Sequence, residues 1–147
     1  MAKNQRQGVI ADANAFIALN WQQDPNHLKA KKVFEKLKSD HYLIWTNNYL
    51  VAEVITVLMQ KLKKVDNVAK VGNQFYSPSA YLKTFQVNLK NQKESLKLFS
   101  TQEKPKLSFP DCTLITQAIK QKISTIFTFD QDIRHFPLLR KGFKFLP

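Results

Sequence analysis

The chain has 147 residues, 44% of them hydrophobic, so it is long and apolar enough to fold around one core and is not a disordered tail. Its 23 Lys and Arg outnumber its 11 Asp and Glu, and the net charge of +12 predicts attraction to nucleic acid or to an acidic protein, with plain solubility as the alternative. The single cysteine excludes an internal disulfide, and no apolar run approaches the roughly 20 residues of a membrane span. The polar first residues predict no signal peptide. We therefore expect one domain, 1–147, in the cytoplasm.

The first half of the chain alternates short apolar runs with amphipathic segments. Residues 8–11 and 42–45 are short and almost continuously apolar, which predicts two buried strands. The segment Thr46-Asn47-Asn48 offers a helix cap after the second run. Helices are predicted over 13–20, 24–39, 48–64 and 65–76.

The second half continues the alternation with less regular strands. Residues 84–87 predict a third, weaker strand, and 125–129 predict a fourth that ends at Asp130. A short edge strand is predicted at 143–145. Helices are predicted over 91–100 and 108–122, the second with Pro110 near its first position.

Strands that alternate with helices predict an α/β fold with right-handed crossovers and a mainly parallel sheet. The near-continuous apolar character of the runs indicates that helices cover both faces of this sheet. Nothing in the chain marks a second domain or an internal repeat.

Four of the scarce acids fall where this fold brings side chains together. Asp12 and Asp130 each follow a predicted strand, Asp111 begins a predicted helix, and Glu53 lies about 8 Å along its helix from the N-terminus. The carboxyl ends of parallel strands and the N-termini of crossover helices lie at the same edge of the sheet, where ligands bind. Carboxylate oxygens are the ligands that Mg²⁺ and Mn²⁺ prefer, so the pattern predicts a divalent metal site.

Each acid also has an ordinary structural explanation. Asp12 and Asp130 can cap the segments that follow them, and Asp111 can stabilise the positive end of its helix. Glu53 fits such an explanation least, because it is the only charge in an apolar helix between Asn47 and Gln60. We expect it to be buried and to need a partner, either a lysine or, more in keeping with the other three acids, a metal.

Further polar residues lie close to these acids in the sequence. Asn14 can act as a cap, hold a metal-bound water or orient Asp12. Thr128 and Asp132 flank Asp130, and Asp132 either extends the acidic set or is a surface acid. Three bases follow, for which we expect phosphate contacts or, alternatively, a solvated surface: Arg134, Arg140 and Lys141.

The ordered set of motifs resembles the PIN domain family (PilT N-terminus). Residues 9–14, Val-Ile-Ala-Asp-Ala-Asn, are similar to its opening motif, and Glu53, Asp111 and the stretch 128–132 are similar to its other acidic motifs. The resemblance covers essentially the whole chain. It implies a sheet of order 3-2-1-4-5 and Mg²⁺- or Mn²⁺-dependent cleavage of single-stranded RNA. The segment 66–83 departs from a minimal member by its length, but no acid is missing.

The resemblance also implies roles and partners. Asp12, Glu53, Asp111 and Asp130 would be the catalytic metal-binding acids, and Asn14 would occupy a polar helper position. Small members are often VapC-like toxins that an antitoxin inhibits and that form homodimers.

Other functions remain open from the sequence. The chain can be a non-catalytic RNA-binding module or a housekeeping RNA-processing nuclease instead of a toxin. A phospho-acceptor signalling domain fits less well, because that fold needs adjacent acids after its first strand, and Asp12 stands alone. The acids can also be nothing more than caps.

Overall fold

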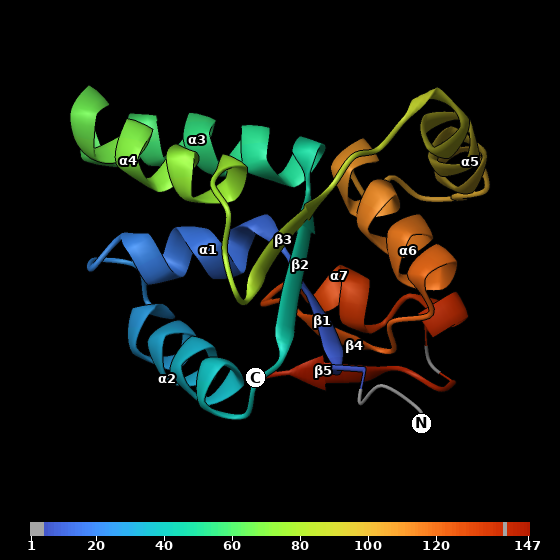
Figure 1. Ribbon diagram of the computed structural model, residues 1–147. Coiled ribbons are helices and arrows are strands. Elements are labelled where there is room, and N and C mark those ends of the chain that lie inside the picture. Colours follow the sequence, from blue (N-terminus) through green and yellow to red (C-terminus); the bar gives the residue numbers. More distant parts are fainter. Residues whose placement is uncertain (1–4, 140) are drawn as a thin grey trace.

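The structure is a computed structural model, and it describes residues 5–139 and 141–147 (Figure 1). A parallel five-stranded sheet of order β3-β2-β1-β4-β5 forms its centre, which confirms the predicted α/β class and strand order. The strands are β1 Gly8–Ala11, β2 Leu43–Asn47, β3 Leu82–Phe85, β4 Thr125–Phe127 and β5 Lys144–Leu146.

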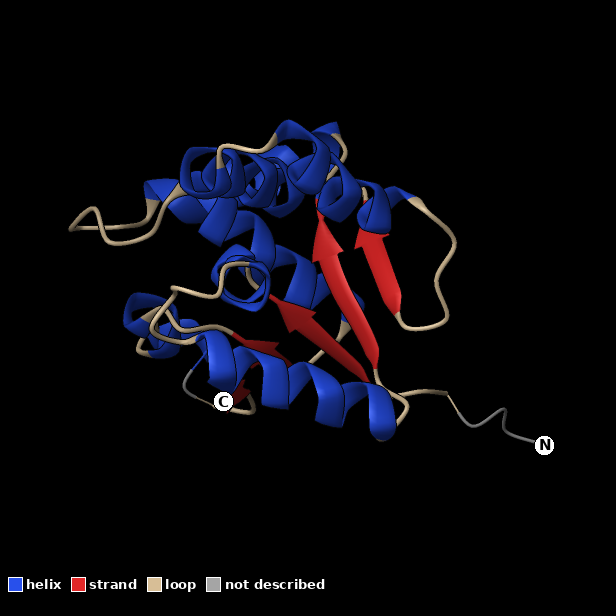
Figure 2. Cartoon of the chain, turned by 90° about the vertical axis from the view of Figure 1, so that its left-hand side faces the viewer, coloured by secondary structure: helices blue, strands red, loops and turns tan. Residues whose placement is uncertain are grey.

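Helices lie on both sides of the strands, as the apolar character of the strand sequences predicts (Figure 2). In Figure 1, α1 and α2 lie to the left of the sheet, and α5 and α6 lie to its right. The helices are α1 Ala13–Asn20, α2 His27–Ser39, α3 Asn48–Leu62, α4 Val65–Tyr76, α5 Leu89–Ser100, α6 Phe109–Gln121 and α7 Gln131–Arg134, with a 3-10 turn η1 at Pro137–Leu139. Among the described residues, no helix is long and apolar enough to cross a membrane.

The order of the strands places a reversal of the chain at β1. From β1 to β3 each new strand is added on the same side of the previous one, whereas β4 pairs with the other side of β1. In open parallel sheets, ligands bind beyond the carboxyl ends of the strands at such a reversal. The residues that follow β1 and β4 are therefore the first to consider as a site.

An aromatic cluster fixes the helices on the left-hand face against this part of the sheet. Phe16 of α1 packs on Phe34 of α2 and on Phe75 of α4, with ring centroids 5.1 and 5.0 Å apart. Phe34 in turn packs on Phe127 of β4 at 5.0 Å. Such pairs contribute about 0.5–1.5 kcal/mol each beyond the burial of their surfaces. They hold the start of α1, and with it Asp12, in a fixed position.

Several element boundaries differ from those predicted. The second strand extends to Asn47, two residues beyond its predicted end, and the Asn47 side chain caps α3, which begins at Asn48 as predicted. The third strand lies two residues earlier than predicted, over Leu82–Phe85, and α5 follows a cap at Asn88. The fourth strand ends at Phe127, two residues earlier than predicted, and the side chain of the next residue, Thr128, donates to Asp12.

Candidate functional site

Asp12 is buried at the end of β1, with 3% of its surface exposed. Its Oδ1 accepts a hydrogen bond from the Ala13 amide at 2.7 Å, so Asp12 caps α1 as one of the two explanations predicted. Its Oδ2 accepts from the Thr128 hydroxyl at 2.7 Å and from the Asn14 amide at 3.2 Å. Capping therefore accounts for one oxygen, and the second belongs to a network that reaches across to the end of β4.

Thr128 and Asn14 join the ends of β1 and β4. The Thr128 hydroxyl oxygen accepts from the Asp130 amide at 3.0 Å and from the Asn14 amide at 3.2 Å. The Asn14 carbonyl oxygen accepts from the Phe129 amide at 3.1 Å. Of the roles open for Asn14, the structure favours the one that orients Asp12, because its side chain contacts both Asp12 and the segment that carries Asp130.

Asp111 and Asp130 each combine a local cap with a place at the same edge. Asp111 forms a capping box with Ser108: its Oδ2 accepts from the Ser108 amide at 2.8 Å, and its own amide donates to the Ser108 hydroxyl at 3.2 Å. Asp130 caps α7 through a 2.8 Å bond from the Asp132 amide to its Oδ1. Within residues 5–139 and 141–147, Oδ1 of Asp111 and Oδ2 of Asp130 accept no hydrogen bond.

Glu53 is exposed, so the prediction that it is a buried charge is wrong. Tyr49 and Val57 lie one turn before and one turn after it on α3, and both are only partly buried. This side of the helix faces the open edge of the sheet and not the core. The neighbouring atoms still desolvate the carboxylate and raise its pKa, and the charges of Asp111 and Asp130 raise it further.

The acids repel one another electrostatically. Burial raises the pKa of Asp12 from 3.8 to about 7, and the charges of Asp111 and Glu53 add to this, against hydrogen bonds from Thr128 and Ala13 that lower it. Burial, followed by the charge of Asp130, also raises the pKa of Asp111, although its Ser108 bonds lower it. Like charges that raise each other's pKa must lie near one another.

No base of the described chain neutralises this cluster. The one salt bridge found within residues 5–139 and 141–147 joins Lys36 and Asp40 at 3.2 Å, on exposed side chains far along the sequence from the acids. In a protein of net charge +12, a group of carboxylates without a basic partner is the arrangement that a cation stabilises.

The chemistry of the donor set fits Mg²⁺ or Mn²⁺, and the spacing of the acids leaves room for the waters that Mg²⁺ keeps. All candidate donors are hard oxygens, and in the described part of the chain Oδ1 of Asp111, Oδ2 of Asp130 and both oxygens of Glu53 accept no hydrogen bond. In the part of the chain described, however, no three His, Cys, Asp or Glu side chains are close enough together to hold one ion directly. Mg²⁺ keeps several waters and uses one or two carboxylates, so a spaced arrangement suits it better than it suits a fully dehydrated ion.

A buried neutral network, which the sequence did not predict, fixes α6 against α3. The Asn47 side-chain oxygen caps α3, while its amide nitrogen donates to Thr113 at 3.2 Å and to Gln117 at 3.0 Å. Thr113 and Gln117 are four residues apart on α6, a spacing that places them on one face and that is the only sequence signal for the network. Through it, the helices that carry Glu53 and Asp111 keep a fixed relation.

Two of the remaining predicted residues, Asp132 and Arg134, lie on the segment that follows Thr128 and Asp130. Asp132 is exposed, and its charge contributes to the raised pKa of Asp111, so the structure does bring it beside the acidic set. Arg134 donates to the Thr128 carbonyl at 2.7 and 3.1 Å and to the Leu146 carbonyl at 2.8 Å, which joins β5 to the site. Lys141 is exposed, and Arg140 lies outside the described residues.

Cys112 directly follows Asp111 and is buried in α6. Burial, with a further contribution from the charge of Asp111, raises the pKa of its thiol to about 11. This agrees with a packing role for Cys112.

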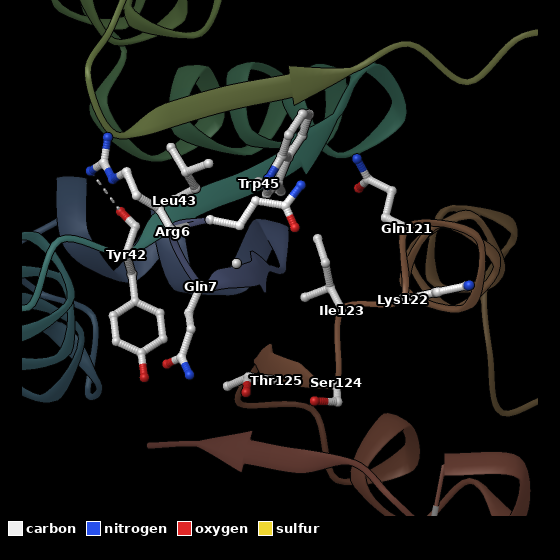
Figure 3. A pocket seen from close by; sticks show the side chains of 12 residues that line it. Arg6, Gln7, Tyr42, Leu43, Trp45, Gln121, Lys122, Ile123, Ser124 and Thr125 are labelled. Carbon is white, nitrogen blue, oxygen red and sulfur yellow. Dashed lines mark hydrogen bonds between the residues drawn. The ribbon is translucent and has the colours of Figure 1, made fainter. Parts of the chain in front are cut away.

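A cavity of about 530 Å³ lies at the opposite edge of the sheet (Figure 3). Its walls come from the starts of β1, β2 and β4, and Trp45 and Ile123 line it. Arg6 belongs to the same wall and donates to the carbonyl of Tyr42. No acid lines this cavity, so it offers no carboxylate ligand for a metal ion.

Comparisons with known proteins agree with the fold and with the order of the motifs. The family model of the PIN domain matches residues 9–139. Among curated proteins, no sequence match is found.

Three solved structures share the fold. VapC20 of Mycobacterium tuberculosis, a sarcin–ricin loop cleaving toxin, has a TM-score of 0.76 at 18% identity and covers 86% of this chain and 92% of its own. VapBC2 from Rickettsia felis, bound to a DNA fragment from its promoter, has a TM-score of 0.66 at 15% identity, with coverage of 95% and 97%. A toxin–antitoxin complex from Klebsiella pneumoniae has a TM-score of 0.60 at 15% identity, with coverage of 92% and 95%. At these identities the likeness shows the fold alone.

Proposed function

The chain belongs to the PIN domain family, and we propose that it is a divalent-metal-dependent endoribonuclease that cleaves single-stranded RNA. The observation that carries this proposal is the cluster of Asp12, Asp111, Asp130 and Glu53 at the reversal point of the sheet. The charge of Asp111 raises the pKa of Asp12 and of Glu53, the charge of Asp130 raises the pKa of Asp111 and of Glu53, and no base in the described chain forms a salt bridge with these acids. Such a cluster is a costly feature unless a cation completes it.

The four acids would hold Mg²⁺ or Mn²⁺, and each would have a role that follows from its position. When bound, such an ion lowers the pKa of water and neutralises charge that develops on a phosphate. Asp12 is the fixed member, because Thr128 and Asn14 orient its Oδ2. Asp111 and Asp130 each present a second oxygen, and Glu53 reaches the cluster from its exposed position on α3. Asp132 would act at the margin of the site.

We further propose that the protein is the toxin of a toxin–antitoxin pair in the cytoplasm, and that it forms a homodimer. Two of the fold neighbours come from toxin–antitoxin complexes, and the third is a toxin that cleaves the sarcin–ricin loop. The excess of lysine would favour both an RNA substrate and an acidic antitoxin. The domain would extend over the whole of 1–147.

The test is cleavage of an end-labelled single-stranded RNA by the purified protein. It compares Mg²⁺, Mn²⁺ and chelator for the wild type, for Asp12→Asn and for the control Asp40→Asn. Asp40 is an exposed acid just before β2, at the other edge of the sheet, and its bond to Lys36 is of the kind that contributes little to stability. We expect metal-dependent cleavage by the wild type and by Asp40→Asn, and none by Asp12→Asn.

The alternatives predict other outcomes. RNA binding without cleavage in any metal would indicate a non-catalytic RNA-binding module. Cleavage that Asp12→Asn retains would indicate a contaminating nuclease. Expression of the wild type and of Asp12→Asn in a bacterial host separates the remaining two functions. Growth arrest by the wild type alone supports a toxin, and unimpaired growth supports a housekeeping nuclease.

A further inference from the structure

We propose that a second cavity, next to the acids, binds one nucleotide of the single-stranded RNA beside the phosphate that is cut. This cavity of about 420 Å³ lies between the loop 101–107, which joins α5 to α6, and the segment 132–137, which contains the end of α7 and the start of η1. The inference rests on the proposed ribonuclease function and adds a substrate-binding site to it.

Both walls of the cavity lead directly into the acidic cluster. On one wall, Leu107 precedes Ser108, the residue that caps Asp111. On the other wall, Asp132 lines the cavity and donates its amide to Asp130. A strand of RNA whose phosphate lies at the acids would therefore place an adjoining nucleotide at this cavity.

The walls are held in place before any ligand binds. The Gln102 side chain donates to the Leu107 carbonyl at 3.1 Å and accepts from the Leu107 amide at 2.8 Å, which closes the loop on itself. On the other wall, the His135 and Phe136 amides donate to the carbonyls of Gln131 and Ile133 at 3.0 and 3.1 Å. A cavity with fixed walls binds a ligand without the cost of ordering them.

Beside the two acids that line the cavity, Glu103 and Asp132, an aromatic ring and two lysines suit the base and the phosphates of a nucleotide. Phe136 is half-buried and offers an aromatic surface for a base, and the side chains of Lys104 and Lys106 are exposed on the opposite wall. Aromatic surfaces that stack bases, combined with cations that follow the phosphates, are the common means of binding single-stranded nucleic acid. The volume lies within the range of about 300–1,000 Å³ that small-ligand sites occupy, which suits one nucleotide and not a duplex.

Binding of a labelled single-stranded oligoribonucleotide in the presence of chelator tests this site without depending on cleavage. The variant Lys104→Ala/Lys106→Ala is compared with Lys31→Ala/Lys32→Ala, which removes the same charge from exposed positions on α2. We expect the first pair to weaken binding at least about fivefold more than the second and to lower the salt dependence of log K by about one to two units. Phe136→Leu keeps an apolar side chain and should weaken binding about tenfold with an unchanged salt dependence.

The outcomes separate this inference from the proposed function. Cleavage by the wild type, with both lysine pairs equal in RNA binding and Phe136→Leu unchanged, would overturn the nucleotide site and leave the nuclease intact. Absence of cleavage, with RNA binding that depends on Lys104, Lys106 and Phe136, would support the site and overturn the nuclease. Absence of RNA binding by the wild type would overturn the site. Thermal unfolding of each variant shows whether a loss of binding comes from a loss of folding.

Discussion

The two edges of the sheet satisfy their polar groups in opposite ways. At the edge where the strands begin, Arg6 donates to the carbonyls of His41, Tyr42 and Ala80, and no acid lines the adjoining cavity. At the edge where the strands end, the charges of Asp111 and Glu53 raise the pKa of Asp12, and the charge of Asp130 raises the pKa of Asp111.

The difference shows at which edge the polar groups are paired without a ligand. The backbone carbonyls at the first edge are matched by a cation that the chain itself supplies. The carboxylates at the second edge have no such cation among the described residues, although the chain has an excess of 12 positive charges elsewhere. The edge that is electrostatically incomplete is the one where we expect metal and substrate.

The largest effect should come from an acid of the second edge. Asp111→Asn keeps an oxygen for the capping box with Ser108 but removes the charge, so folding should be retained. We expect cleavage of single-stranded RNA to fall more than about 100-fold, since even residues behind a metal ligand cost about 10–100-fold. Asp40→Asn should cleave like the wild type. Equal activity of the two variants would remove the distinction between the edges.

The neutral network at the same edge should contribute mainly to stability. Asn47→Ala removes the cap of α3 and leaves the buried Gln117 Oε1 without its donor, while the Thr113 hydroxyl keeps its bond to the Pro110 carbonyl. We expect the free energy of unfolding to fall by roughly 2–4 kcal/mol, as measured by urea denaturation. Asn47→Ser keeps an oxygen for the cap and should lose less. A loss below about 0.5 kcal/mol for Asn47→Ala would show that the network is not required.

The pH dependence of stability should differ between the metal-free and metal-bound protein. The folded pKa of Asp12 is about 7, above its ordinary 3.8, so between these values the folded protein holds a proton that the unfolded chain has released. This contribution stabilises at low pH and is lost as the pH rises through about 7. In chelator, we expect a lower melting temperature at about pH 8 than at about pH 5, with a smaller fall in Asp12→Asn.

Added Mg²⁺ should reverse this fall at the higher pH, since the ion binds the ionised form. An identical fall in the wild type and in Asp12→Asn would show that Asp12 is not the group responsible.

The smallest effect should come from the first edge. Arg6→Ala removes the bonds to His41, Tyr42 and Ala80, all of them on an exposed side chain. We expect the free energy of unfolding to fall by about 1 kcal/mol, with RNA cleavage unchanged. Loss of cleavage in a stably folded Arg6→Ala would show that the first edge takes part in the reaction.

The sequence predicted the fold well where the pattern is local. The helix over 65–76 is confirmed with the same bounds, because the break at Ser77-Pro78-Ser79 that ends it is visible in the chain. The carboxyl ends of β1 and β4 are adjacent as predicted, since a parallel sheet fixes which edge receives Asp12 and Asp130. The roles of these acids as metal ligands stay a prediction.

What the sequence could not predict depends on the third dimension. Glu53 was expected to be a buried charge because its helix is apolar, but its side chain is exposed on α3. The partners of Asn47 are more than sixty residues away in the sequence, and nothing local marks them. The same holds for the cavity beside the acids, which two loops form only after the helices have packed.

The thiol of Cys112 has a practical consequence for following the motions of this protein. With a pKa of about 11, roughly one thiol in ten thousand is ionised near pH 7, and burial keeps reagents away from it. A thiol reagent can therefore modify Cys112 only when α6 opens. The labelling rate would then report how often the helix that carries Asp111 leaves its place, and how far a bound ion or RNA slows that opening.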